Sequence, residues 1–484
     1  MEGENACALP GVSIKYDTFI PVMWKAVAKG FVRHEDACFV ADGLRYGFTA
    51  GVDITKMPGH RWFKNYESSL SAREPVTRAI MKRVQAQNST LDLGVWNSRL
   101  GDLVRASFAA TAIFPMGAVA KPLEPTELRP TDDHSRTGLN AATSLDFLRH
   151  SLTAYEDIAW FLAQDYFMRV SDVEAAFPLL PLHPDVWPFF LFRFFADASN
   201  NMHLFVHVTG DFGAAGMPGV FKKFFSDVVV GMARSVQVLT LPMVIYVDDC
   251  GLIGGCRDAV DAEMVRFHTW AWVVCGIVFK AIKDRVAAQN QLMLGFWWDS
   301  RTFTRTLEER KLLQYVDLLA NFASRTTLTL RELQSVAGRM QRCIMTFPPG
   351  AACLLVSVFT LMVGLRLPWH ARRTTRATRK DFSLVHQLLT MNLGRGYFSY
   401  SNFTEAPEVN TDASKSSRYT GGGYVSRCGM YNWWKYGSRA ARRPIDFLEG
   451  DSWLFVRVFS VDYVHLEGGL AGEWGRSDRV GRFA

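Results

Sequence analysis

Cysteine is scarce in this sequence and never closely paired. The chain of 484 residues holds eight cysteines, and no CxxC pair occurs among them. Disulfide frameworks and structural zinc sites use cysteines at short spacings, so this pattern excludes both and indicates the reduced thiols of an intracellular protein. No N-terminal signal peptide is visible, which fits that expectation. The sequence does not distinguish the nucleus from the cytoplasm. The cysteines are Cys7, Cys38, Cys250, Cys256, Cys275, Cys343, Cys353 and Cys428.

Long hydrophobic runs, internal repeats and low-complexity tracts are missing as well. The most apolar window, residues 351–365, is short for a bilayer span, so we expect a buried helix there and no membrane partner. Hydrophobic residues make up 49% and charged residues 21%, an ordinary globular composition, and the length suggests about three domains. The net charge of +7 fits a nucleic-acid partner without requiring one.

The most informative stretch is residues 241–254, with the sequence LPMVIYVDDCGLIG. An apolar run reaches Tyr246 and Val247, meets the adjacent carboxylates Asp248 and Asp249, and is followed by a second apolar run. Two acids between two short strands predict the tip of a β-hairpin, because aspartate tolerates the backbone of a turn. Such a tip can direct carboxylate oxygens at one point, and Mg²⁺ prefers oxygen ligands. By itself, a solvated hairpin turn is an equally good interpretation.

Two further β-rich segments precede this hairpin. One run ends in Asp172, and an aromatic residue, Phe177, follows five residues later. Residues 184–196 and 202–208 resemble two aromatic strands, and the turn at 197–201 between them predicts a second hairpin. We therefore expect Asp172 to lie at the end of a strand.

Two loops in the same half of the chain carry residue types that suit a nucleotide. Residues 114–140 are polar and marked by proline, and their Lys121 and Arg129 suit a basic hairpin that clamps phosphates. Residues 210–221 form a glycine-rich turn that leads into a predicted helix at 219–234, and glycine lets a backbone approach a flat ligand. The alternatives are a solvated loop for the first segment and a plain helix start for the second.

In order and spacing, these motifs resemble those of the reverse transcriptases of retroviruses and retrotransposons. The basic block, the strand ending in Asp172, the turn at Gly213 and the acidic hairpin follow that family's order. Two later segments agree: GIVFKAIK at 276–283 is similar to the family's lysine-bearing segment, and LGFWWD at 294–299 to its primer-gripping strand. RPTDDHSRTGLN, FGAAGMPGVF and TDAS are most similar to retrotransposons of the DIRS and Ngaro type.

The resemblance implies an α+β fold shaped like a right hand, with fingers, palm and thumb, followed by a partial ribonuclease H-like α/β domain. It implies that Asp172 and Asp248 hold two Mg²⁺ ions, for which Mn²⁺ could substitute. The backbone carbonyl of Val173 would help, and Asp249 would support the catalytic site less directly. One ion lowers the pKa of a primer 3′-hydroxyl and the other neutralises charge on the leaving pyrophosphate.

The resemblance also implies a nucleotide pocket and a primer grip. Lys121 and Arg129 would hold the triphosphate of an incoming deoxynucleotide (dNTP), and Phe177 would lie under its sugar and exclude a 2′-hydroxyl. The expected partners are an RNA template, a DNA primer and the RNA–DNA hybrid, which the protein would grip by backbone and shape. The other implied residues are Phe212, Gly213 and Pro218 in the pocket, Lys283 near the pyrophosphate, and Leu294, Gly295 and Phe296 in the primer grip.

Beyond residue 300 the pattern becomes helical. Amphipathic helices are predicted at 307–322 and 330–345, the second opened by a capping box from Thr329 to Glu332. Helices of this kind suit a thumb and connection that close over a duplex. The basic stretch at 366–380 either contacts phosphates or forms a solvated helix face.

The final segment is similar to the opening of a ribonuclease H domain. We expect three strands between 408 and 436 and then a helix, with Asp412 and Glu449 matching that family's first two metal ligands. The next acidic strand is missing, because Asp462 follows too closely and Asp478 lies in a polar terminus. A domain that is cut short or frame-shifted makes cleavage of an RNA strand doubtful.

These expectations divide the chain into an N-terminal extension (1–105), a fingers and palm core (106–300), thumb and connection helices (301–400) and a partial ribonuclease H-like domain (405–484). They predict an RNA-directed DNA polymerase of a mobile element. The alternative is a degenerate or domesticated copy that binds nucleic acid without polymerising. The intact acids argue against the alternative and the missing ribonuclease half argues for it. The sequence does not indicate template preference or oligomeric state.

Overall fold

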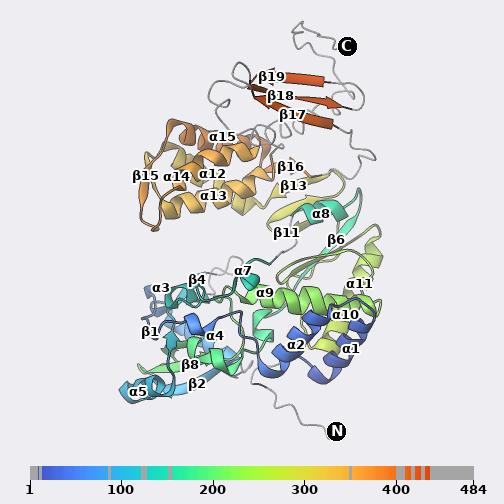
Figure 1. Ribbon diagram of the computed structural model, residues 1–484. Helices are drawn as coiled ribbons and strands as arrows, with labels where there is room; N and C mark the ends of the chain where they lie inside the picture. Colours follow the sequence, from blue (N-terminus) through green and yellow to red (C-terminus); the bar gives the residue numbers. More distant parts are fainter. Residues whose placement is uncertain are drawn as a thin grey trace. The chain divides into compact units, whose positions relative to one another are not determined.

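A computed structural model of the chain divides into two compact units, residues 1–294 and 295–484 (Figure 1). Helices and strands are mixed in both units, as an α+β fold requires. The residues that the structure describes are 9, 13–85, 89–120, 128–150, 155–347, 351–398, 409–415, 420–426 and 431–435.

A three-stranded antiparallel sheet in the first unit holds the predicted acidic hairpin. The register places Asp249 opposite Tyr246 on one side and opposite Asp172 on the other. Buried Leu252 shares a core with Val260 and other apolar side chains of the following helix, α11 (Arg257–Trp270). The hairpin and the strand ending in Asp172 are therefore confirmed. The strand order is β6 (Phe167–Asp172), β10 (Asp249–Gly254) and β9 (Met243–Tyr246).

A five-stranded mixed sheet forms another part of the first unit. Its order is β1 (His60–Trp62), β3 (Thr111–Ile113), β7 (Leu191–Phe195), β8 (Met202–His207) and β2 (Thr90–Val95). Residues 1–105, expected as an extension, thus supply β1 and β2 to the sheet that holds the β7–β8 hairpin. That hairpin was predicted, but its first strand was placed too early. Pro184–Phe189 is a 3-10 helix, η3, since Pro184 and Pro188 lack the N–H that a strand ladder needs.

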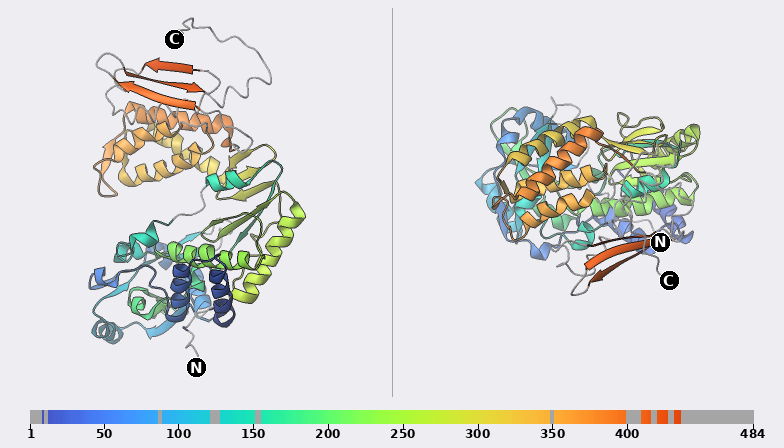
Figure 2. Two further views of the ribbon diagram at one scale, coloured as in Figure 1. Left: turned by 45° about the vertical axis from the view of Figure 1, so that its right-hand side comes forward. Right: turned by 90° about the horizontal axis from the view of Figure 1, so that it is seen from above.

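The predicted basic hairpin and the predicted helix after the glycine-rich turn are both present. The hairpin pairs β4 (Met116–Ala120) with β5 (Leu128–Asp132), and its tip, 121–127, lies outside the described residues. The helix begins two residues earlier than predicted. It runs as α9 (Met217–Phe221), the π-helical η4 (Lys222–Val229) and α10 (Val230–Ser235). Figure 2 shows the dark blue helices α1 (Tyr16–Ala28) and α2 (His34–Tyr46) against this green helix.

The core of the first unit is rich in aromatic side chains. Phe19 of α1 stacks on Phe224 of η4 with ring centroids 5.8 Å apart. Each fully buried side chain of this size contributes roughly 1.5–3 kcal/mol to folding. The remaining elements are η1 (Ile54–Lys56), α3 (Glu67–Leu70), α4 (Arg73–Gln85), α5 (Ser98–Ser107), α6 (His134–Thr137), α7 (Leu145–Leu148), α8 (Tyr155–Phe161), η2 (Phe177–Leu179), η5 (Ala271–Cys275) and β11 (Asn290–Met293).

The second unit is mainly helical. The predicted helices are confirmed as α12 and α13, with α12 displaced by two residues. The capping box of α13 is formed: Thr329 N donates to Glu332 Oε2 over 2.8 Å, and Glu332 N donates to Thr329 Oγ1 over 3.3 Å. The helices are α12 (Glu309–Ser324), α13 (Leu330–Ile344), η6 (Ala351–Leu355), α14 (Val356–Met362) and α15 (Arg376–Asn392), and the strands are β12 (Phe296–Asp299), β13 (Thr304–Leu307), β14 (Thr327–Thr329), β15 (Ala371–Arg373) and β16 (Arg395–Tyr397).

The apolar window at 351–365 was expected to be one buried helix, which is wrong. The chain changes from the 3-10 helix η6 to α14, and Phe359 and Val363 are 42% and 69% exposed. Only the side chains of one stripe, such as Val358 and Leu361, are buried. Within the described ranges, the structure holds no helix with the length and apolarity that a membrane crossing needs.

The last described segments are three antiparallel strands, as predicted. They are β17 (Val409–Lys415), β18 (Thr420–Ser426) and β19 (Tyr431–Lys435), in that order in the sheet. Asp412 lies in β17 opposite Gly423. Glu449, Asp462 and Asp478 lie outside the described residues.

Candidate active site

The acidic hairpin turns through a two-residue loop, Val247-Asp248, because Tyr246 and Asp249 already pair across it. Only Asp248 therefore lies at the tip, whereas Asp249 begins β10. Val247 has a φ of 58°, a left-handed conformation that β-branched residues rarely adopt. Strained backbone of this type is often found at functional sites.

Three carboxylates meet where this loop approaches the end of β6. Oxygens of Asp172, Asp248 and Asp249 lie within 4.8 Å of one another. Asp172 is buried at 1% exposure, and it faces Asp249 because the two strands are in register. The amide of Val173 donates to the carbonyl of Asp248 over 2.9 Å, which ties the loop to β6. Oxygen ligands grouped in this way suit divalent cations.

The electrostatics of the cluster also favour a cation. Burial raises the pKa of Asp249 to about 7; the charge of Lys283 opposes this shift, and the charges of Asp248 and Asp172 add to it. Burial also raises the pKa of Asp248, with a further contribution from the charge of Asp172. The three groups therefore repel one another when ionised, and a divalent cation would relieve that repulsion.

Two lysines approach the same carboxylates from the segment after η5. The ammonium groups of Lys280 and Lys283 both form ion pairs with Asp172, and Lys283 Nζ lies 3.7 Å from Asp249 Oδ1. The amide of Lys280 donates to the carbonyl of Asp172 over 2.9 Å, so the backbone positions this segment. Sequence reasoning selected Lys283 but missed Lys280, although the three-residue spacing of the two lysines was visible.

Three of the residues expected in a nucleotide pocket lie together. The ring of Phe177, 4% exposed, is 4.7 Å from that of Phe212, and the guanidinium of Arg129 lies 4.1 Å above the Phe212 ring. Gly213 follows Phe212, and a Cβ there would lie 2.1 Å from the carbonyl oxygen of Asp132. Pro218 is in the first turn of α9. Lys121 lies outside the described residues.

The residues expected to grip a primer form a turn at the boundary of the two units. Leu294 and Gly295 have φ values of 53° and 81°. Phe296 is fully buried and packs on Trp298 with ring centroids 6.4 Å apart. The Phe296 side chain therefore belongs to the core of the second unit, and the ends of the Lys311 and Arg342 side chains lie against Gly295.

Of the comparisons with known proteins, the one with solved structures found similar folds. No protein-family model and no curated protein matches the sequence. The foamy viral protease-reverse transcriptase in complex with an RNA/DNA hybrid is similar with a TM-score of 0.52 and 15% identity, over 92% of this chain and 55% of that chain. The same viral enzyme with double-stranded DNA is similar with a TM-score of 0.52 and 14% identity, over 92% of this chain and 86% of that chain.

This chain therefore has a reverse-transcriptase-like fold. It spans 55% of the length of the first of these structures, so part of that longer protein has no counterpart in the comparison.

Proposed function

We propose that this protein is an RNA-directed DNA polymerase of a mobile element, related to the DIRS and Ngaro retrotransposons. The observation that carries the proposal is the cluster of Asp172, Asp248 and Asp249 in a chain with a reverse-transcriptase-like fold. Two-metal transfer needs carboxylates from neighbouring elements that can share cations. The end of β6 and the tip of the β9–β10 hairpin supply them.

The residues present fit a pair of divalent cations, since three mutually repelling carboxylates converge. Asp172 and Asp248 would hold the ions together with the carbonyl of Val173, and Asp249 would assist. When bound, two Mg²⁺ or Mn²⁺ ions lower the pKa of the primer 3′-hydroxyl and neutralise charge on the leaving pyrophosphate. Lys280 and Lys283 would then exchange their ion pairs with Asp172 for contacts to phosphate oxygens.

The aromatic pair beside Arg129 would select the nucleotide. Phe177 would lie under the sugar, and its ring would collide with a 2′-hydroxyl, which favours dNTPs. Arg129, and Lys121 of the same hairpin, would hold the triphosphate, because a guanidinium offers a planar fork of donors to phosphate oxygens. Phe212 and Gly213 would shape the surface on which the new base pair forms.

The proposed partners are an RNA template, a DNA primer and their hybrid. The similar foamy viral structures hold an RNA/DNA hybrid in one case and double-stranded DNA in another. For this chain we propose that α12, α13 and α15 act as a thumb that holds the duplex. Strands β17–β19 would be the beginning of a ribonuclease H-like domain with Asp412 as one ligand. No cleavage of the RNA strand is expected.

Primer extension on an RNA template with purified protein, Mg²⁺ and dNTPs tests the proposal. Wild type should extend the primer, and Asp248→Asn should lose at least about 100-fold in rate, since one metal ligand is gone. Asp185→Asn is the matched control: Asp185 is 67% exposed and its carboxylate lies 3.5 Å from His183 Nδ1, so activity should not change. Tight binding of template–primer without extension by wild type would favour the non-polymerising alternative.

A further inference from the structure

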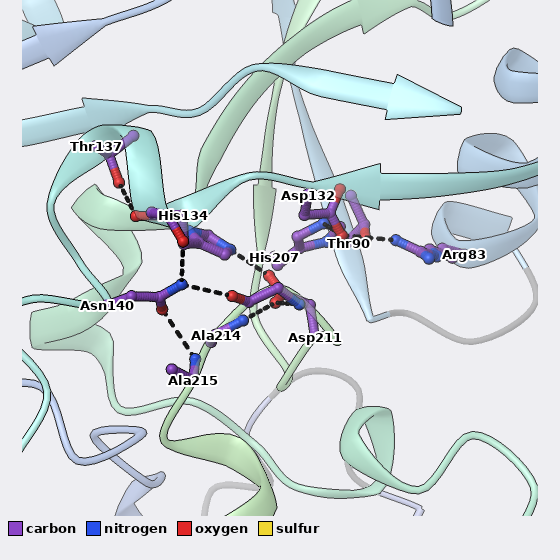
Figure 3. A network of polar contacts seen from close by, with 12 residues as sticks. Arg83, Thr90, Asp132, His134, Thr137, Asn140, His207, Asp211, Ala214 and Ala215 are labelled. Atoms are coloured by element: carbon purple, nitrogen blue, oxygen red, sulfur yellow. Dashed lines mark hydrogen bonds and ion pairs between the residues drawn. The ribbon is translucent and has the colours of Figure 1, made fainter. Parts of the chain in front are cut away.

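A network of buried charged side chains lies between the basic hairpin and the glycine-rich turn (Figure 3). His134, His207 and Asp211 are 0%, 2% and 4% exposed. A buried charge is costly unless it is paired, so each member constrains the position of the next. The side chains come from well-separated segments: Arg83 of α4, Thr90 of β2, Asp132 of β5, His134 of α6, His207 of β8 and Asp211 of the turn.

The network balances its own charges. His134 Nε2 lies 2.7 Å from Asp211 Oδ2, and Asp132 Oδ2 lies 3.7 Å from both Arg83 Nη1 and His207 Nε2. Burial opposes a charge on His134, yet its pKa is raised, because the charge and hydrogen bond of Asp211 and the charges of Asp132 and Asp133 outweigh burial. The carboxylates of Asp132 and Asp211 thus each face a basic side chain, Arg83 and His134 respectively.

Asp211 uses its second oxygen to hold the glycine-rich turn. Oδ1 accepts hydrogen bonds from the amides of Gly213 and Ala214 over 2.8 and 3.0 Å. Asn140 secures the same turn, because its Nδ2 donates to the carbonyl of Gly213 over 3.1 Å and its Oδ1 accepts from the amide of Ala215 over 2.9 Å. The backbone on the C-terminal side of Phe212 is therefore fixed by side chains.

The turn also packs directly on the segment that carries His134. A Cβ on Gly213 would lie 2.1 Å from the carbonyl oxygen of Asp132 and 2.9 Å from Cδ2 of His134. The Phe212 side chain is 46% exposed, packs against Phe177 and lies beneath the guanidinium of Arg129. Any shift of the Asp211–His134 pair would therefore move the aromatic surface that Phe212 offers.

We propose that Asp211 and His134 are positioning residues for the incoming nucleotide: their buried ion pair holds the Gly213 turn so that Phe212 keeps its place beside Phe177 and Arg129. This inference rests on the proposed polymerase function and adds two residues to it. Neither residue touches the nucleotide, so their loss changes nucleotide binding more than the chemical step.

A pH dependence follows from the pair. His134 faces Asp211 across the turn and Asp132 and Asp133 on its own segment; Asp132 in turn faces Arg83 and His207. Its folded-state pKa is raised above the ordinary 6.5, so the contribution of the pair is complete below about 6.5 and is lost as pH rises through the folded-state pKa. The KM for dNTPs should therefore rise on the alkaline side.

Steady-state primer extension with Asp211→Asn and His134→Gln tests the inference. The asparagine of the first variant can still accept hydrogen bonds from the two amides but loses the ion pair, so KM for dNTPs should rise roughly tenfold while kcat changes by less than about twofold. His134→Gln keeps a neutral donor, so the alkaline rise of KM should disappear. Asp185→Asn, at a carboxylate that is 67% exposed, is the control and should change neither quantity.

The outcomes separate this inference from the function on which it rests. If wild type extends primers and Asp211→Asn leaves KM unchanged, or lowers kcat alone, the positioning role is refuted and the polymerase stands. If Asp211→Asn does not fold, the pH profile of His134→Gln decides, and an unchanged alkaline rise refutes the role. If wild type extends no primer, the proposed function fails. The affinity of the protein–template–primer complex for Mg²⁺-dTTP, followed by intrinsic fluorescence, then replaces KM, and equal affinities or no binding refute the role.

Discussion

Replacing Asp249 by asparagine should stabilise the metal-free protein above neutral pH. The Asp249 carboxyl has a pKa of about 7 in the folded chain against an ordinary 3.8, since burial raises it, Lys283 opposes the shift, and Asp248 and Asp172 add to it. The folded state therefore binds this proton more tightly than the unfolded state. By linkage, stability falls as pH rises from about 4 to about 7 and is level above that.

The size of the effect follows from the same shift. The difference between 3.8 and about 7 corresponds to about 4 kcal/mol at 1.36 kcal/mol per pKa unit. Because the side chain is 35% exposed, solvent screens part of this effect. We therefore expect the substitution to stabilise the folded state by about 2 kcal/mol at alkaline pH. For a unit of 294 residues this is a rise in melting temperature of about 4 °C.

Thermal unfolding in EDTA, followed by circular dichroism at pH 5 and pH 8.5, measures this effect. Asp249→Asn should melt above wild type at pH 8.5, and the gap should shrink at pH 5. Asp53→Asn is the control of opposite sign. Hydrogen bonds from Thr55 lower the pKa of Asp53, so removal of this carboxylate should not raise the melting temperature. Added Mg²⁺ should raise the melting temperature of wild type more than that of Asp249→Asn. If Asp249→Asn melts at or below the temperature of wild type at pH 8.5, the ionised Asp249 carboxylate does not destabilise the fold and the reasoning is refuted.

Three further predictions concern the pocket and the C-terminal strands. Phe177→Ala should increase the ratio of ribonucleotide to deoxynucleotide incorporation, and an unchanged ratio in competition assays would make Phe177 a core residue only. Gly213→Ala should reduce extension strongly, because its Cβ would lie 2.1 Å from a carbonyl oxygen, whereas Gly59→Ala, with open space around it, should leave extension unchanged. A labelled RNA–DNA hybrid should stay uncut in Mg²⁺ or Mn²⁺; cleavage that Asp412→Asn abolishes would show a complete ribonuclease H site.

The sequence predicted elements whose determinants are local. The acidic hairpin, the capping box at Thr329 and the strands β17–β19 depend on turn residues, caps and alternation within a few positions. Two predictions failed where local propensity was misread. The strand expected from 184 ignored Pro184 and Pro188, and the helix expected to be buried at 351–365 has only one buried stripe.

The rest could not be predicted because it depends on contacts between distant segments. Lys280 pairs with Asp172 across 108 positions, and His134 pairs with Asp211 across 77. No spacing rule identifies such partners in a single sequence. Besides the spacing of the two lysines, a visible signal was an isolated polar residue in an apolar strand, His207 in LFVHV, which is buried beside Asp132.

The stability cost of the carboxylate cluster supports the proposed polymerase function over the alternative of a chain that binds nucleic acid without polymerising. Val247 is held at a positive φ, and burial together with the charges of Asp248 and Asp172 costs about 2 kcal/mol for the ionised Asp249 carboxylate. A chain that only bound nucleic acid would gain stability from asparagine at Asp248 or Asp249, since the cost of burying mutually repelling carboxylates would be removed. Most substitutions at these three positions would end metal binding, and each acid is nevertheless present. Carboxylates kept together against burial and mutual repulsion, which bound cations would relieve, are what a site for two-metal chemistry should show.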